Sequence, residues 1–320
     1  MRPTLLAWFA ALLASAPGMA APWAYITNQA SNDVSIVDGA RMAEVRRVPV
    51  GKAPAGVVVS AAAGRAFVSN ADTPSLSAID LASGEVVAEA ALPGTVVGLA
   101  ASPDGKALYL ADWYRNRLLV VDAQTLAPVR ELPVGRTPAG VGVSADGRRV
   151  FVANREDDDI SVIDTRTWRT VARVAVGAHP FALGLTPDGR TLLAANVVSN
   201  DVSVVDLATM RETARVPVGA APYGIAFDAA GQRAFVTNQQ DASVSVIAPA
   251  TGRVLATWPT AEYPEGIAWS AGRVWVVSWM EERLQILDAD SGKEVGSVGL
   301  GSNPRGFGRF LSDAAVGPGR

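Results

Sequence analysis

The sequence predicts an all-β protein, a seven-bladed β-propeller with four-stranded blades. The first observation is a repeat, because one polar residue recurs every 42 residues, at Asn28, Asn70, Asp112, Asn154, Asn196 and Asn238. The second observation is that each of these residues ends a short apolar segment and begins a copy of the same strand pattern. A period of about 40–45 residues with four short strands is typical of propeller blades.

The unit around Asn154 accounts for each strand in turn. Segment 150–154 (VFVAN) is an apolar strand, and 160–164 (ISVID) is a second strand that ends in Asp. A turn leads to a third strand, 171–177 (VARVAVG), then to a Gly-x-x-Pro corner and to a further strand of the kind seen at 140–147 (GVGVSADG). Apolar residues alternate with small or polar ones, as expected for stacked pleated sheets. The seventh copy, at 274–279 and 284–288, arrives one residue early.

A ring of seven blades explains how the chain buries its apolar residues. One blade cannot cover its own apolar faces, whereas stacked blades cover one another. The first copy, 24–28, begins on the second strand of a blade, and segment 305–310 reads as a first strand. We expect 305–310 to complete blade one and close the ring. A single domain over residues 21–312 follows.

The two ends of the chain differ from the repeats. Residues 1–20 carry Arg2 as their only charge, an apolar run at 4–15 and small residues before a cleavage point between Ala20 and Ala21. This pattern predicts a bacterial signal peptide and a periplasmic or secreted protein. The alternative is an uncleaved anchor, but the apolar run is about half of a membrane span. Residues 313–320 read as a disordered tail.

Composition excludes several classes of function. The chain has 28 basic and 31 acidic residues and a net charge of −3, so it has no electrostatic footprint for nucleic acid. It contains no cysteine, which excludes a lipid-anchored lipoprotein, disulfides, thiolate metal sites and a Cys nucleophile. No zinc motif, phosphate-binding loop or nucleophile–base pair is present. We therefore predict no catalytic residues, no metal site and no bound cofactor, and we expect a monomer.

The recurring polar residues are expected to serve the fold. The strand-end Asn side chains should bond to their own backbone two residues on and cap the turn. A second recurring set should open turns, and it comprises Asp38, Asp80, Asp122, Asp164, Asp206 and Asp288. The Gly-x-x-Pro segments should form rigid corners between blades. In blade seven Trp279 stands where we expect the cap, and it would leave that turn without one.

The repeat pattern [AV]-[FY]-[IV]-[ST]-N, then VSVID, then VxVGxxPxG, resembles the YVTN-family (YncE-like) β-propeller repeat over residues 24–310. The resemblance places the chain in the superfamily of quinoprotein amine dehydrogenase β-chains. It implies relatives of several kinds: surface proteins, cofactor-free subunits of amine dehydrogenases, accessory propellers of alcohol oxidation and haem-carrying propellers of nitrite reductases. Fold alone does not choose among these functions.

Function is expected where the repeats differ from one another. The residues around the corner Pro and those after the strand-end Asn should lie on one rim of the ring, and they include large aromatic and charged side chains. Such side chains are enriched in interfaces and in pockets for flat ligands, although they also fill space beneath loops. The predicted rim site comprises Trp113, Tyr114, Arg155, His179, Phe181, Tyr223, Tyr263, Glu265, Trp279, Met280 and Arg305.

Two single features invite chemical interpretations. His179 is the only histidine, and histidine can ligate haem iron or transfer protons. Without a second histidine or a cysteine it reads as a rim residue. The acidic run Glu156–Asp159 offers carboxylates for calcium but lacks the EF-hand spacing, so a solvated loop is favoured.

Two functions of different classes remain open. The first is a non-enzymatic scaffold that binds an unidentified periplasmic protein or small ligand at the aromatic rim. The second is a propeller subunit or accessory factor of a quinone- or haem-dependent periplasmic oxidoreductase system.

Overall fold

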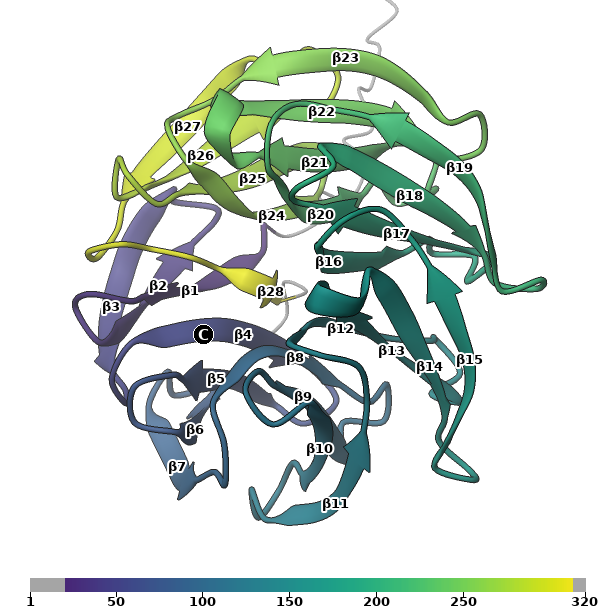
Figure 1. The fold of residues 1–320 in the computed structure, drawn as a ribbon. Coiled ribbons are helices and arrows are strands. Elements are labelled where there is room, and N and C mark those ends of the chain that lie inside the picture. The colour runs from purple at the N-terminus through teal and green to yellow at the C-terminus, as the bar shows by residue number, and fades with distance from the viewer. Residues whose placement is uncertain (1–20, 313–320) are drawn as a thin grey trace, which may run out of the picture.

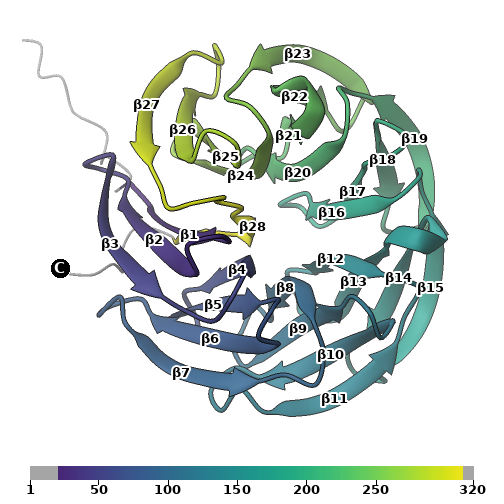
Figure 2. The same ribbon diagram turned by 60° about the vertical axis from the view of Figure 1, so that its left-hand side comes forward.

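Seven antiparallel sheets surround a central axis, as the sequence predicts (Figure 1, Figure 2). The computed structural model describes residues 21–312. The predicted signal peptide, 1–20, and the predicted tail, 313–320, lie outside the described residues. Among residues 21–312, no helix has the length and apolar character needed to cross a membrane.

Blade 1 combines both ends of the described chain, and blades 2 and 3 follow it. Blade 1 consists of β29 (Leu311–Ser312), β1 (Trp23–Asn28), β2 (Asp33–Asp38) and β3 (Ala43–Pro49). Blade 2 consists of β4 (Pro54–Ser60), β5 (Arg65–Asn70), β6 (Ser75–Asp80) and β7 (Val86–Ala91), with β28 (Phe307–Arg309) added inside. Blade 3 consists of β8 (Val96–Ala101), β9 (Ala107–Asp112), β10 (Arg117–Asp122) and β11 (Pro128–Pro133).

Blades 4 to 7 are continuous in sequence. Blade 4 consists of β12 (Pro138–Val143), β13 (Arg149–Asn154), β14 (Asp159–Asp164) and β15 (Arg169–Ala175), with the 3-10 turn η1 (Arg155–Asp157). Blade 5 consists of β16 (Pro180–Leu185), β17 (Thr191–Asn196), β18 (Asp201–Asp206) and β19 (Arg211–Pro217). Blade 6 consists of β20 (Pro222–Phe227), β21 (Ala234–Asn238), η2 (Gln239–Asp241), β22 (Ser243–Ala248) and β23 (Arg253–Pro259). Blade 7 consists of β24 (Pro264–Ser270), β25 (Arg273–Ser278), β26 (Arg283–Asp288) and β27 (Glu294–Gly299).

The position of a strand within its blade sets its composition. The two middle strands, such as β13 and β14, are buried on both faces and are therefore nearly continuous in Val, Ile and Phe. The outermost strands alternate exposed residues with partly buried ones and carry most of the charge. The innermost strands are short and rich in Gly and Ala, and their outer edges pair with the next strand. Their other edges are directed toward the central channel.

The glycine two residues after the corner Pro allows the blades to approach closely. A Cβ atom on Gly56, Gly140 or Gly224 would lie between 2.2 and 2.5 Å from a backbone carbonyl oxygen of the following inner strand. The same holds at 1.9 Å for Gly98, which follows Val96 in place of the Pro, and at 2.5 Å for Gly266, which faces the carbonyl oxygen of Arg305. Real Cβ atoms do not come so close to an oxygen atom. This glycine is therefore required by blade-to-blade packing, whereas blade 5 carries Ala182 at the same position.

The expectation that the strand-end Asn caps its own turn is wrong. Asn154 is buried with extended backbone, and its Nδ2 donates to Asp159 Oδ1 at 2.6 Å and to Ser161 Oγ at 2.8 Å. Its Oδ1 accepts a hydrogen bond from the backbone N of Gly135 at 2.9 Å. Asn28, Asn70, Asn196 and Asn238 also donate to side chains of the neighbouring strand. In blade 4 the Asn thus joins two strands to the corner glycine. In Asn28, Asn70, Asn196 and Asn238 the amide nitrogen joins two strands, and the buried Oδ1 atom has no hydrogen-bond partner.

The prediction that the second recurring set, the Asp residues at the ends of the second repeat strands, opens turns is confirmed. The Asp164 carboxylate accepts hydrogen bonds from the backbone N of Arg166 and Thr167, at 3.0 and 2.8 Å. Equivalent bonds begin the turns after Asp38, Asp80, Asp122 and Asp288. These bonds stabilise the ionised carboxylate and lower the pKa of Asp164 below its usual range.

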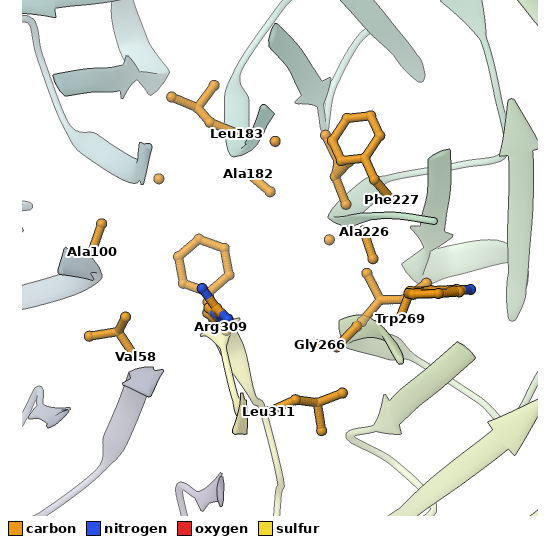
Figure 3. A pocket seen from close by; sticks show the side chains of 18 of the residues that line it. Val58, Ala100, Ala182, Leu183, Ala226, Phe227, Gly266, Trp269, Arg309 and Leu311 are labelled. Atoms are coloured by element: carbon orange, nitrogen blue, oxygen red, sulfur yellow. The ribbon is translucent and has the colours of Figure 1, made fainter. Parts of the chain in front are cut away.

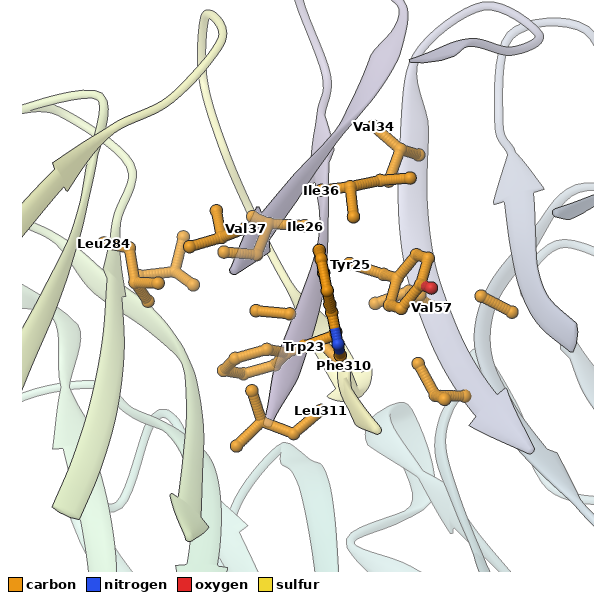
Figure 4. Packing of buried hydrophobic residues seen from close by; sticks show 14 of the residues in the cluster. Trp23, Tyr25, Ile26, Val34, Ile36, Val37, Val57, Leu284, Phe310 and Leu311 are labelled. Carbon is orange, nitrogen blue, oxygen red and sulfur yellow. The ribbon is translucent and has the colours of Figure 1, made fainter. Parts of the chain in front are cut away.

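The end of the described chain closes the ring against β1 in two steps. Pro304 bridges Asn28, and the Arg305 backbone N donates to Thr27 O at 2.9 Å. The chain then leaves β1, since β28 pairs in parallel with β4, and it returns as β29 beside Trp23 and Ala24. The predicted closure of the ring is confirmed, but the prediction of a continuous first strand over 305–310 is wrong. The buried side chains of Phe310 and Leu311 pack between blades 1 and 7 (Figure 4).

Candidate functional site: the central channel and its aromatic rim

The corner Pro residues and the strand-end Asn residues lie at the same end of every blade, which we call the Asn rim. In each blade the residue after the strand-end position donates its backbone N–H to the carbonyl oxygen of the residue before the corner Pro, over 2.9–3.2 Å. In blade 5 the pair is Val197 and His179, and in blade 7 it is Trp279 and Tyr263. The two variable sets therefore share one rim, as the sequence predicts.

Four aromatic side chains from blades 3, 5 and 6 and from β28 meet at the centre of the Asn rim. Phe181 lies against Tyr223, with ring centroids 4.3 Å apart, and against Phe307 at 4.7 Å. Trp113 meets the edge of Phe181 at 6.2 Å. Phe181, Tyr223 and Phe307 are only 6–7% exposed. These rings fill the channel at this end, so the packing interpretation holds for Phe181 and Tyr223. Phe307 was missed in the sequence because it belongs to the non-repeating excursion of β28.

A buried polar cluster lies beside these rings. The Glu265 carboxylate is 2% exposed and accepts hydrogen bonds from Gln239 Nε2 at 2.8 Å and from Arg305 Nη1 at 3.4 Å. Arg305 also donates to Gln29 Oε1 at 2.8 Å and to the Tyr223 hydroxyl at 3.3 Å. Burial raises the pKa of Glu265 to about 7, although Arg305 and Gln239 favour its ionised form. The pKa of Tyr223 is also raised by burial.

Other predicted rim residues face the solvent. Tyr114 is 76% exposed and Met280 is 51% exposed, and both stand two places after the strand-end residue. Val198, at the same place in blade 5, is 56% exposed and was not included in the predicted rim site. Arg155 is half-buried, with its guanidinium 6.0 Å from the Trp113 ring.

The interpretation of Trp279 as a missing cap is wrong. Ser278 pairs with Pro264 as Asn154 pairs with Pro138, so Ser278 occupies the strand-end position. Its hydroxyl donates to Glu262 O at 2.6 Å and accepts from the backbone N of Glu281. Trp279 is the next residue, and its ring lies 5.8 Å from that of Tyr263. The comparison of the repeats placed the strand-end position of blade 7 one residue too late, because the preceding turn is shorter in this blade.

His179 lies on the Asn rim, away from the channel lining. Its Nε2 is 3.7 Å from Glu156 Oε2, and its backbone N donates to Asp158 Oδ1 at 2.8 Å. The acidic run Glu156–Asp159 also forms ion pairs with arginine side chains, since Asp157 contacts Arg136 and Arg173. Within residues 21–312 no cluster of three or more His, Cys, Asp or Glu side chains has the arrangement of a metal site.

Below the aromatic rings the channel is hollow. A cavity of about 680 Å³ is lined by the inner strands of blades 2 to 7 and by the segment from Gly306 to Leu311. Most lining side chains are small or aliphatic, and Phe227, Trp269 and Phe307 provide rings. Figure 3 shows the side chain of Arg309 within this space, together with Val58, Ala182 and Trp269. The lining continues to Pro187 and Asp228, in the turns of the opposite rim.

Comparison with family models relates two parts of the chain to known families. Residues 142–228 match the model described as YNCE-like beta-propeller. Over this segment the chain is similar to YncE-like β-propellers. Residues 23–140 match a second model, described as the Cytochrome D1 heme domain. None of the curated proteins compared with it matches the chain.

Solved structures resemble this propeller in fold. Hydrazine synthase of Kuenenia stuttgartiensis is 24% identical with a TM-score of 0.68, over 74% of this chain and 77% of that one. A functionally unknown protein from Desulfotomaculum acetoxidans DSM 771 is 14% identical with a TM-score of 0.79, over 93% and 99%. The dihydro-heme d1 dehydrogenase NirN in complex with DHE is 19% identical with a TM-score of 0.67, over 88% of this chain but only 64% of that one.

The residues that line the channel do not fit a haem held there through its iron. Proteins hold haem iron with His, Cys, Met or Tyr side chains. The cavity lining contains none of these four residue types. His179 and Tyr223 lie outside the lining, and Tyr223 is already hydrogen-bonded to Arg305. The chain therefore matches a haem-domain model, although the lining of its channel has no residue that holds haem iron. A proposed function has to account for both observations.

Proposed function

We propose that this protein is a haem-free accessory propeller of a haem- or quinone-dependent oxidoreductase system outside the cytoplasm. The observation that carries the proposal is the combination of a match to the Cytochrome D1 heme domain model over 23–140 with a channel lining that contains no His, Cys, Met or Tyr side chain, the types that hold haem iron. The chain shares its fold with haem proteins, while the lining of its channel lacks these ligands for haem iron. The predicted signal peptide is consistent with an exported partner of such a system.

The Asn rim is the surface proposed to contact the partner. Its centre is rigid, because the aromatic rings and the pair of Glu265 and Arg305 are packed and hydrogen-bonded. Around this centre stand exposed apolar side chains, Tyr114, Val198 and Met280. Aromatic and Met side chains on a rigid frame are typical of protein interfaces. A non-enzymatic binding role at this rim is thus compatible with membership of a redox system.

The haem-free character is tested by spectroscopy. The exported protein, purified with its full chain, should show no visible absorption band of haem or quinone. Titration with haemin should give no ligand-field spectrum of a His- or Tyr-bound iron, and the His179→Ala variant should behave identically. A stoichiometric haem spectrum that disappears in His179→Ala would contradict the proposal and would make the protein a haem carrier.

A further inference from the structure

The channel below the aromatic rings is a cavity that the proposed function does not use. Its volume of about 680 Å³ falls within the range of pockets for small molecules. At the Asn rim the rings of Phe181, Tyr223 and Phe307 close the cavity. Its lining continues to Pro187 and Asp228 in the turns of the opposite rim. A ligand would therefore enter from the opposite rim.

Apolar side chains that are only partly buried line this cavity on the inner strands of blades 4 to 7. They stand three and five residues after the corner Pro, with Gly or Ala between them. They include Val141, Val143, Leu183, Leu185, Phe227 and Trp269. Figure 3 shows Leu183, Phe227 and Trp269 around the same space. A concave apolar surface that stays accessible within a protein is typical of a ligand-binding site.

The ionisable side chains at the lining are already engaged by other groups. Within residues 21–312 these side chains are Asp228, Glu265 and Arg309. Arg233 lies between two carboxylates, with its Nε 3.1 Å from Asp228 Oδ2 and its Nη1 2.9 Å from Asp290 Oδ1. Glu265 Oε2 lies 3.4 Å from Arg305 Nη1, and Arg309 has an interaction of its own. The lining therefore offers no unpaired charge to a ligand.

A ligand of this cavity should for that reason be uncharged. A charged molecule would lose its hydration on entering an apolar cavity, and no unpaired group of opposite charge would offset that cost. A few polar atoms can be accommodated. Strands β8, β12, β16, β20 and β24 are end strands of their sheets, so their inner edges present backbone N–H and C=O groups to the channel. The side chain of Ser270 also lines the cavity.

We propose that the channel binds an uncharged, largely apolar organic molecule built on two or three rings. Its rings would lie among Leu183, Phe227 and Trp269, below the aromatic side chains of the Asn rim. The inference goes beyond the proposed function and does not depend on the redox partner. A titration of the purified protein alone therefore tests the channel, and its failure would leave the proposed function standing.

Two fluorescent probes with the same ring body test the requirement for an uncharged ligand. N-phenyl-1-naphthylamine is uncharged, and 8-anilinonaphthalene-1-sulfonate carries a sulfonate on the same rings. We expect one saturable site for the uncharged probe on the folded wild-type protein and at least ten-fold weaker binding of the sulfonate. The affinity for the uncharged probe should change less than two-fold between low and high salt, because no ion pair forms.

Two substitutions of Ala by Phe locate the bound probe. Ala100 lines the cavity and is partly buried, so Ala100→Phe adds a ring inside the channel and should weaken binding of the uncharged probe at least ten-fold. Ala91→Phe, at an exposed position of the outer strand β7, is the matched control and should change binding little. A melting temperature close to that of wild type shows that each variant is folded. If Ala100→Phe melts early, Ser270→Phe at the open end of the cavity provides the same test.

Deletion of residues 313–320, which lie outside the described residues, distinguishes a foreign ligand from the end of the chain itself. The deletion should leave the affinity for the uncharged probe unchanged. A ten-fold rise in affinity would show that this segment occupies the channel and would overturn the proposal. The proposal would equally be overturned if wild type had no saturable site, if the sulfonate bound as tightly as the uncharged probe, or if folded Ala100→Phe or Ser270→Phe bound like wild type.

Discussion

The backbone carbonyl oxygen of Phe181 lies 2.2 Å from the place that a Cβ atom on Gly140 would occupy. Blades 4 and 5 therefore meet through backbone alone at this point, and the same relationship recurs between other blades. We expect Gly140→Ala to force the two inner strands apart and to destabilise the protein by at least about 2 kcal/mol, as overpacking does.

Thermal or urea unfolding measures this effect. Gly299→Ala is the matched control, because nothing lies within 4 Å of the added Cβ at that strand position, and it should change the free energy of unfolding little. Equal stability of the two variants would show that the blades can separate without cost.

Blade 3 replaces the buried Asn with an ion pair, and this substitution can be reversed. Asp112 is fully buried, and its Oδ2 accepts a hydrogen bond from Arg117 Nε at 2.8 Å. Arg117→Ala should cost about 3–5 kcal/mol, because it leaves a buried carboxylate without its partner. The double variant Asp112→Asn with Arg117→Ser recreates the Asn70 and Ser75 pair of blade 2 and should recover most of that loss. A double variant as unstable as Arg117→Ala would refute this equivalence, as chemical denaturation of both proteins would show.

Glu265 should make stability depend on pH. Its folded pKa of about 7 lies above its ordinary value of 4.5. Between these values the folded protein holds a proton that the unfolded chain has lost, so the free energy of unfolding falls as pH rises from 4.5 to 7. At 1.36 kcal/mol per pKa unit the total fall is up to about 3 kcal/mol.

The Glu265→Gln variant has no titrating group at this position, so it isolates the contribution of Glu265 to the pH dependence of stability. Its stability relative to wild type should rise across that pH window and then stay constant above pH 7, as measured by urea unfolding at several pH values. The exposed Glu85→Gln is the control and should run parallel to wild type. If Glu265→Gln also ran parallel, the pKa of Glu265 in the folded protein would equal its pKa in the unfolded chain.

The closing segment should be essential to the ring. Phe310 is fully buried between blades, so Phe310→Ala should cost about 3–5 kcal/mol. Truncation after Pro304 removes β28 and β29 and exposes the edge of β1, so we expect insoluble protein or a large fall in melting temperature. Deletion of residues 313–320, which lie outside the described residues, should have no effect. A truncated chain that melts like the full chain would refute closure by this segment.

The repeat made the architecture predictable from sequence, since each blade repeats the residues that its turns need. Asp164 and its counterparts open turns through local backbone bonds, and local rules suffice for them. The role of Asn154 was predicted wrongly because its partners lie outside its own turn, Ser161 in the neighbouring strand and Gly135 in the corner before the blade. A Ser seven residues after each of the five Asn residues was the available signal.

The site was less predictable than the fold. The Asn rim could be predicted, because the corner Pro and the strand-end Asn fix the same end of a blade. The burial of the aromatic rings at this rim could not be predicted, because Phe181 is covered by Phe307. Phe307 comes from a segment that does not repeat. The sequence also gave no indication of the channel lining, since Val58 and Arg309 become neighbours only when the ring closes.

Capture of a redox partner at the Asn rim tests the central claim most directly. Tagged wild-type protein, the double variant Tyr114→Ser with Met280→Ser, and the outer-strand control Val87→Ser would be used to isolate partners from the periplasmic extract of the native host. All three replaced residues are exposed, so folding should be retained. We predict that wild type and Val87→Ser retain an oxidoreductase that carries haem or a quinone cofactor, identified by its absorption spectrum, and that the double variant loses it. Retention by all three proteins, or a partner without such a cofactor, would contradict the account.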